Sequence, residues 1–307
     1  MQANPPRRFL DNAHPPHIAT LILLAGASAL TMNIFLPSLP SMTIYFGTEY
    51  AVMQLSVAVY LGFSAFLQLF IGPISDKLGR RPVLLWGIAL FCVATLGCLL
   101  TSNVYVFLVF RMAQAVIAVA MVLSRAVVRD MYPQDQAASM IGYVAMGMAV
   151  VPMIGPAIGG MLDQYIGWQA NFWLLLVVGV ALFWLVYRDL GETATSTDNT
   201  IAQQFREYPE LLKSPRFWGY CLASAFGSGA FFAYLGGSPF VATSVFGLSP
   251  AKMGMFFAAP SLGYFVGNYL SGAHSARIGV NRMVLWGSLL IVLGEKGTIR
   301  KPRSWSF

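Results

Sequence analysis

The chain has 307 residues, of which 57% are hydrophobic and only 10% are charged. Soluble domains carry about 25% charged residues, so a soluble fold of this composition would lack a polar surface. The composition therefore favours a protein that crosses a lipid bilayer. The formal net charge of +7 does not indicate nucleic-acid binding, because the basic residues stand in short segments between apolar stretches.

Eight apolar stretches are each long enough, at about 20 residues, to cross a bilayer as a helix. They are 18–37, 51–73, 83–101, 104–126, 139–162, 169–188, 216–237 and 250–272. A ninth begins at Met283 and stops near Gly294. The stretches are continuously apolar and do not alternate in polarity, which predicts an all-α polytopic membrane helix bundle and excludes a β-barrel.

The basic residues predict the orientation, since cytoplasmic loops of membrane proteins are enriched in Lys and Arg. Apart from Arg111 and the residues after 294, all but one of them fall on one side of the predicted bundle. These are Arg7, Arg8, Lys77, Arg80, Arg81, Arg125, Arg129, Arg188, Arg206, Lys213, Arg216, Arg277 and Arg282, and Lys252 is the exception. We therefore predict a bacterial inner-membrane protein with a cytoplasmic N-terminus at 1–17 and a cytoplasmic linker at 189–215.

An internal repeat relates residues 72–79 to 272–279, at an offset of 200 residues. Glycine, serine and a basic residue recur at matching positions, and the motif Leu-Trp-Gly follows in both copies. Such a repeat predicts two six-helix halves in parallel arrangement. The first half is 18–188, and the second, at 216–294, is incomplete because it holds spans seven, eight and the start of nine.

The chain stops inside span nine and turns abruptly polar and basic at 295–307. A span of about 12 residues cannot cross the bilayer. We therefore expect a C-terminally truncated chain whose tail, 295–307, is read out of frame, from a protein of about 400 residues. The alternative is a short protein that is complete as it stands.

The loop between spans two and three reads Gly72-Pro-Ile-Ser-Asp76-Lys-Leu-Gly79-Arg80-Arg81. Its glycines permit a tight turn, and an acid at a helix end can face the positive N-terminus of a neighbouring helix. A plain basic loop would have a similar composition. However, the pattern G-x-x-x-D-x-x-G-R-R resembles the signature loop of the major facilitator superfamily. The resemblance implies that Asp76 caps a helix of the second half and that Arg80 or Arg81 pairs with Asp130.

Three further segments support this resemblance. Span four holds Arg111-Met-Ala-Gln114, similar to the superfamily motif R-x-x-Q-G with alanine in place of the glycine. The segments 35–40 and 125–132 are similar to the bicyclomycin-resistance and chloramphenicol-efflux branch of its drug/proton antiporters. Span five resembles the G-P-x-x-G-G motif of these antiporters through Pro152, Gly155, Pro156, Gly159 and Gly160.

Prolines kink helices, and glycines four residues apart permit close helix packing. Ordinary small-residue packing would explain the composition of span five. The resemblance adds that this helix lines the substrate cavity and is typical of exporters.

Arg111 lies well inside a span, where ionisable residues are costly and usually face a polar cavity. Gln114, three positions further on, shares its helix face. We interpret the pair as lining the transport path, and the resemblance implies a role in proton coupling. The alternative is a structural arginine that holds carbonyl groups of neighbouring helices.

Asn33 stands at a position where the resemblance leads us to expect an acid. A drug/proton antiporter needs a group that gains and loses a proton near neutral pH, and asparagine does not titrate. No Asp or Glu lies deep in any of the eight stretches. Asp163, near the end of span five, and an acid outside this chain are the alternatives.

Candidate substrate-cavity residues are Met32, Asn33, Phe35, Tyr60 and Tyr234, with simple packing as the alternative for each. An aromatic, methionine-bearing cavity with few charges suits amphipathic organic compounds.

The sequence thus predicts a secondary exporter of small amphipathic drugs or metabolites, which works by proton antiport and alternating access. A dedicated exporter of one metabolite and a non-transporting fragment are the alternatives. The expected partners are a small-molecule substrate, protons and the bilayer, with no nucleic acid and a monomeric state. The histidines are isolated and no nucleophile–base pair or metal-ligand cluster is apparent, so we predict neither enzyme activity, nor a metal, nor a cofactor.

Overall fold

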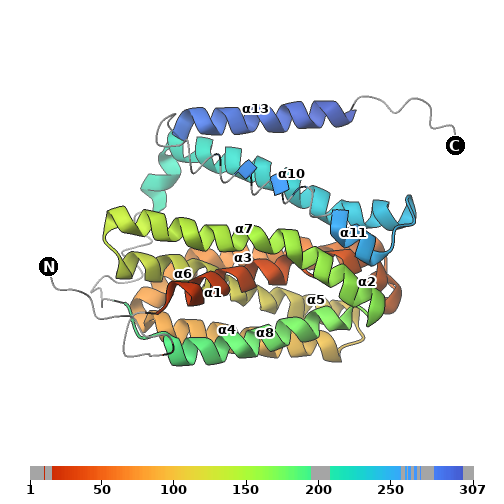
Figure 1. Ribbon diagram of the computed structural model, residues 1–307, viewed down its shortest axis with the longest axis horizontal. Coiled ribbons are helices and arrows are strands. Elements are labelled where there is room, and N and C mark those ends of the chain that lie inside the picture. Colours follow the sequence, from red (N-terminus) through yellow and green to blue (C-terminus); the bar gives the residue numbers. More distant parts are fainter. Residues whose placement is uncertain are drawn as a thin grey trace.

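The computed structural model describes residues 10, 16–194, 208–256, 260, 262–263, 266–267, 270 and 280–299. Every regular element in this part of the chain is a helix, which confirms the predicted all-α fold (Figure 1). The N-terminal arginines, the repeat copy at 272–279 and part of predicted span eight lie outside the described residues.

The first half contains six helical segments that are long and apolar enough to cross a membrane, in agreement with the first six predicted stretches. Its elements are α1 (Ile18–Asn33), η1 (Leu36–Ser38), α2 (Leu39–Phe46), α3 (Tyr50–Leu78), α4 (Arg80–Leu100), α5 (Val104–Ala113), η2 (Gln114–Ile117), α6 (Ala118–Met131), α7 (Gln134–Tyr165) and α8 (Gln169–Asp189).

Two of these spans are interrupted by a 3₁₀ turn. In the first span, Pro37 and Pro40 remove backbone donors, so α1 passes through η1 into α2 and the span continues to Phe46, beyond the predicted end at residue 37. In the fourth span, η2 begins directly after the turn that carries Arg111. A 3₁₀ stretch inside a longer helix often marks a functional position.

The core of the first half is built around α1, which packs against α6, α7 and α8. Buried apolar side chains from α1, η1 and α2 fill its centre, among them Leu21, Leu24, Leu36 and Met42. Many apolar side chains on the outside of the bundle are exposed in the structure, as expected for a surface that faces lipid.

The two ends of the bundle differ in composition. At one end, here called the linker end, Asp189 accepts hydrogen bonds from the backbone of Leu10 and His17 and from Thr20 Oγ1, at 2.8, 3.0 and 2.6 Å. This end also carries the loops around Gly79 and Pro133. The opposite end, here called the far end, holds packed aromatic rings of α2, α5 and α8, namely Tyr45, Phe46, Phe107, Trp168 and Phe172.

Three helices follow the linker, α10 (Pro215–Ser244), α11 (Pro250–Phe256) and α13 (Val280–Ile299). The 30-residue α10 is long enough to cross a membrane, but its many glycine and serine residues keep it less apolar than the six spans of the first half. In α13, the helix continues to Ile299, whereas the sequence predicted an end near Gly294.

These helices contact the first half mainly at the far end, where α11 packs against α7 and the end of α10 lies against α2 and η1 (Figure 1). Tyr50 Oη and Gln54 Nε2 each donate to the carbonyl of Gly236 at 2.9 Å. The backbone of Ala251 donates to Gln164 Oε1 at 3.3 Å. At the linker end, Tyr208 Oη donates to the carbonyl of Leu69 at 3.2 Å. Three of these four hydrogen bonds lie at the far end, so the two parts of the chain are held together mainly there.

Candidate functional site

A cavity of about 690 Å³ lies between the first half and α10. Its lining from the first half is Ser28, Ala29, Met32, Asn33, Tyr60, Leu61, Ser64, Gln68, Met121, Met148 and Pro152. Its lining from the second is Ala223, Ser224, Gly227, Ser228, Phe231, Phe232 and Pro260. None of these residues is Asp, Glu, Lys, Arg or His, and the walls combine apolar surface with hydroxyl and amide groups.

Three of the predicted cavity residues, Met32, Asn33 and Tyr60, line this space. The side chain of Asn33 is almost buried, with 4% exposed, and its Nδ2 donates to the carbonyl of Ala29 at 2.7 Å. Phe35 is fully buried and is absent from the lining, because it packs in the layer behind.

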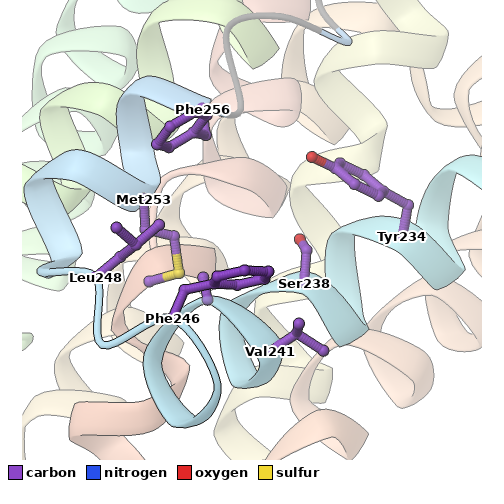
Figure 2. A pocket seen from close by; sticks show the side chains of 8 residues that line it. Tyr234, Ser238, Val241, Phe246, Leu248, Met253 and Phe256 are labelled. Carbon is purple, nitrogen blue, oxygen red and sulfur yellow. The ribbon is translucent and has the colours of Figure 1, made fainter. Parts of the chain in front are cut away.

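Tyr234 lines a different pocket, so the structure does not bring it together with the other predicted cavity residues. This second pocket, of about 510 Å³, lies between α10 and α11 at the far end. In Figure 2 the sulfur of Met253 lies next to the phenyl ring of Phe246, and Phe256 and Tyr234 line other sides of the pocket. Tyr234 reaches this pocket because it sits nearer the far end of α10 than the cavity-lining residues 223–232.

Arg111 lies one layer behind the cavity wall, with 1% of the residue exposed. Its guanidinium is sandwiched between the rings of Phe35 and Tyr60, at 4.2 Å from each centroid. Both rings present their negative faces to the cation. Since Tyr60 lines the cavity, one aromatic ring separates the Arg111 charge from this space.

Neutral oxygen atoms accept all the hydrogen bonds found for the Arg111 side chain. Nη1 donates to Gln114 Oε1 at 2.8 Å, and Nη2 donates to the carbonyl of Thr31 at 2.9 Å. Nε donates to the carbonyl of Ser56 at 3.3 Å. Gln114 extends this hydrogen-bond network, because its Nε2 donates to Thr95 Oγ1 at 2.7 Å. The side chain thus ties α1, α3, α4 and α5 together, which is the arrangement that the structural alternative expected.

The signature loop forms a second arginine centre at the linker end. Arg80 pairs with Asp76 Oδ1 at 2.5 Å and with Asp130 Oδ2 at 3.0 Å. Arg81 Nη2 donates to the carbonyl of Tyr187 at 2.9 Å, and its guanidinium lies over the ring of that residue. Of the two arginines that the resemblance offered as partners of Asp130, Arg80 makes the contact. The capping of a second-half helix by Asp76 stays a prediction.

Glu192 joins this centre, and sequence reasoning missed it. Its Oε1 accepts from the backbone N–H of Arg80 at 2.8 Å and its Oε2 from that of Arg81 at 3.2 Å. The carboxylate therefore caps the N-terminus of α4, where unpaired N–H groups and the helix dipole favour negative charge. Gly79, with φ of 94°, leaves room for it, since a Cβ atom there would collide with the carboxylate.

The antiporter-like helix α7 runs without interruption through Pro152 and Pro156. Its glycines serve two interfaces. A Cβ atom on Gly159 would collide with the backbone carbonyl of Ile34 in the first span, and one on Gly160 would collide with the carbonyl of Pro250 at the start of α11. Gly155 also faces the first span. The motif therefore permits close backbone contact both within the first half and across to the second.

Asp163 lies one turn beyond Gly159, at the far end, and only 8% of it is exposed. Its Oδ2 accepts a hydrogen bond from Ser41 Oγ at 2.6 Å. Beside it, Asn171 Nδ2 donates to Ser38 Oγ at 2.9 Å and to the carbonyl of Gly159 at 3.2 Å. This polar cluster joins α2, η1, α7 and α8, and none of its members lines the large cavity.

The fold and site define a multi-pass α-helical membrane protein with a cavity whose described lining residues are uncharged. The family model of the Major Facilitator Superfamily matches residues 21–294. The chain belongs to this superfamily.

Individual relatives agree with this assignment. A chloramphenicol resistance protein of Pseudomonas aeruginosa is 34% identical over 249 residues, which cover 80% of this chain and 59% of the relative. An uncharacterized MFS-type transporter, YdgK, of Bacillus subtilis (strain 168) is 32% identical over 256 residues, covering 81% of this chain and 64% of the relative. The chain thus spans less than two thirds of the length of either relative.

Among solved structures, a bacterial homolog of the human lysosomal transporter Spinster, in an inward-facing and occupied conformation, matches with a TM-score of 0.68. It is 18% identical, and the match covers 86% of this chain and 62% of that one. At this identity the likeness concerns the fold alone.

Proposed function

We propose that this chain exports small amphipathic drugs or metabolites across the bacterial inner membrane as a secondary transporter. The observation that carries the proposal is the cavity of about 690 Å³ between the two parts of the chain, because its size suits a drug-sized ligand. Its mixture of apolar walls and a few neutral polar groups suits amphipathic compounds. A relative named for chloramphenicol resistance supports export as the direction.

The proposed orientation has the linker end in the cytoplasm. Of the described basic residues that the sequence placed on that side, Arg80 and Arg81 lie in the signature loop, Lys213 lies just before α10, and Arg216 lies in its first turn. Lys252, the exception, lies in α11 at the far end. Positive charge on the cytoplasmic side is the usual bias of inner-membrane proteins.

The proposed mechanism is alternating access, in which the two parts rock about the cavity. In this structure the contacts of Gly160 with Pro250 and of Tyr50 with Gly236 hold the far end together. Opening toward the outside requires these contacts to separate. The antiporter-like glycines of α7 serve this step, since close backbone packing without side-chain interlock can form and break repeatedly.

Proton antiport is the proposed driving reaction. Asn33 lines the cavity but does not titrate, so the proton needs another carrier. Asp163 is the candidate, because it is a nearly buried carboxylate about one turn beyond Gly159 and Gly160, through which α7 contacts the first span and α11. Arg111 and Gln114 contribute by holding the wall behind Tyr60 in place.

The test is transport by the 307-residue chain in everted membrane vesicles, with chloramphenicol as the first compound. We expect uptake into the vesicles that depends on a proton gradient and stops when the gradient is collapsed. Asp163→Asn should abolish the dependence on the gradient, and Glu210→Gln, at an exposed position of the linker, is the carboxylate control. No uptake of chloramphenicol or of a panel of amphipathic compounds would overturn the proposed function.

A further inference from the structure

The amide of Asn33 has a fixed orientation at the cavity wall. Because Nδ2 donates to the carbonyl of Ala29 at 2.7 Å, the other amide atom, Oδ1, is the one available as an acceptor. Among the described residues, this buried Oδ1 receives no hydrogen bond. In this structure neighbouring side chains cover Oδ1, so a ligand reaches it when they shift. A buried acceptor without a donor is unfavourable, and an N–H or O–H group that a ligand brings there satisfies it.

The charge nearest to the cavity is positive. Arg111 lies directly behind Tyr60, and its hydrogen-bond partners are neutral oxygens. In the described part of the chain no carboxylate pairs with it. Inside a low-dielectric protein an uncompensated charge acts over longer distances than in water, so its field reaches the cavity.

The other side chains that line the cavity favour the binding of apolar ligand surface. Met32, Met121 and Met148 supply flexible, polarizable side chains, and Phe231 and Phe232 supply rings from α10. Such walls adapt to flat or irregular organic skeletons. They offer no carboxylate to neutralise a cation that would leave water to enter the cavity.

We propose that this cavity selects uncharged amphipathic compounds that carry a hydrogen-bond donor for Asn33 Oδ1, and that it discriminates against organic cations. The inference rests on the proposed function, since it names the substrate class of the same cavity. It follows from three features that act together: the unpaired acceptor of Asn33, the absence of acidic residues from the described lining, and the Arg111 cation one ring behind the wall.

Three compounds with one fluorescent skeleton separate these features. Dansylamide is uncharged and carries an N–H donor, N,N-dimethyl dansylamide is uncharged without that donor, and the trimethylammonioethyl derivative of dansylamide keeps a donor and adds a permanent positive charge. Their binding to the purified full chain in detergent is measured by fluorescence titration. We expect dansylamide to bind about five- to ten-fold more tightly than the donor-free compound. We expect the cation to bind about ten-fold more weakly than dansylamide.

Variants at the wall test the assignment to one residue. Asn33→Leu should reduce dansylamide to the affinity of the donor-free compound and leave that compound unchanged. Asn33→Asp should reverse the order, so that the cation binds most tightly. Met32→Leu, at the neighbouring lining position, is the matched control and should keep the wild-type order. Elution of each variant as a single species checks that it folds.

The outcomes distinguish this inference from the proposed function. Binding of the cation as tight as that of dansylamide, in the wild-type chain, overturns the charge selection without any need for a variant. A donor preference that survives Asn33→Leu overturns the role of Asn33. If none of the three compounds binds, the cavity is no ligand site, and the proposed function fails together with the inference.

Discussion

The molecule contains two buried or partly buried arginines, and each has its positive charge stabilised by a different kind of partner. Arg111, inside the membrane-spanning bundle, meets two aromatic rings and neutral oxygens. Arg80, at the linker end, meets the carboxylates of Asp76 and Asp130. The first is fully buried, whereas the second keeps some contact with solvent. Both tie several helices of the first half together.

The different partners of Arg111 and Arg80 reflect the cost of burying charge in the membrane-spanning bundle and at its partly solvated end. Burying a second charge beside Arg111 would require further desolvation, whereas backbone carbonyls and ring faces are already part of the packed bundle. At the linker end, water solvates carboxylates that are only partly buried, so ion pairs form at lower cost. The membrane centre should therefore be intolerant of substitution, and the linker centre should be tolerant and sensitive to salt.

Arg111→Ala should have the largest effect. It removes the cation and leaves Gln114 Oε1 and the carbonyl of Thr31 without the donor that Arg111 supplies, and each buried acceptor left unpaired costs about 1–3 kcal/mol. We expect export to fall to background while the protein still inserts into the membrane. Vesicle uptake and the amount of protein in the membrane fraction measure the two effects.

The matched control for this change is Arg125→Ala, on the same span. Arg125 is exposed and contacts Met148 Sδ at 3.9 Å. Export should stay near the wild-type rate. Unchanged export in Arg111→Ala would refute the role of Arg111.

Arg80→Ala should have the second-largest effect, a fall in export of about ten-fold, because it breaks two partly buried ion pairs. Raising the salt concentration should reduce the difference between variant and wild type, since screening already weakens these pairs. Lys77→Ala, at an exposed position of the same loop, is the control and should change little. A difference independent of salt would show that Arg80 acts through packing and not through its charge.

The sequence predicted those features of the molecule that depend on local residue patterns. Six apolar stretches became helices, because length and hydropathy decide whether a segment spans a membrane. The resemblance of the signature loop offered Arg80 or Arg81 as the partner of Asp130, and Arg80 makes the contact. Three of the five candidate residues, Met32, Asn33 and Tyr60, line the cavity.

The sequence did not predict features that depend on how helices rotate against each other. Whether Arg111 faces the cavity or lies behind Tyr60 differs by a fraction of a helical turn, which motif spacing does not resolve. Glu192 lies in a polar segment with several other acids, and its cap on α4 joins residues 112 positions apart in the chain. Tyr234 faces a second pocket because α10 passes two cavities along its length.

Glu192→Ala should have a smaller effect than either arginine change. It removes the cap from the N-terminus of α4 and should destabilise the protein by about 1 kcal/mol, while export changes by less than about three-fold. Thermal unfolding of the purified protein measures the change. Glu210→Ala, at an exposed position within the linker, is the control. An equal loss of stability in both variants would argue against the cap.

The smallest effect is the coupling between Gly79 and Glu192. Gly79→Ala should destabilise the protein for two reasons, because its φ of 94° strains any L-residue and because the added Cβ meets the Glu192 carboxylate. In the Glu192→Ala background only the backbone strain remains. The double variant should therefore be more stable than the sum of the two single changes predicts, by about 0.5–1 kcal/mol. Strict additivity would mean that the carboxylate does not occupy the space that glycine leaves open, and the linker centre would then consist of Arg80 and its two aspartates alone.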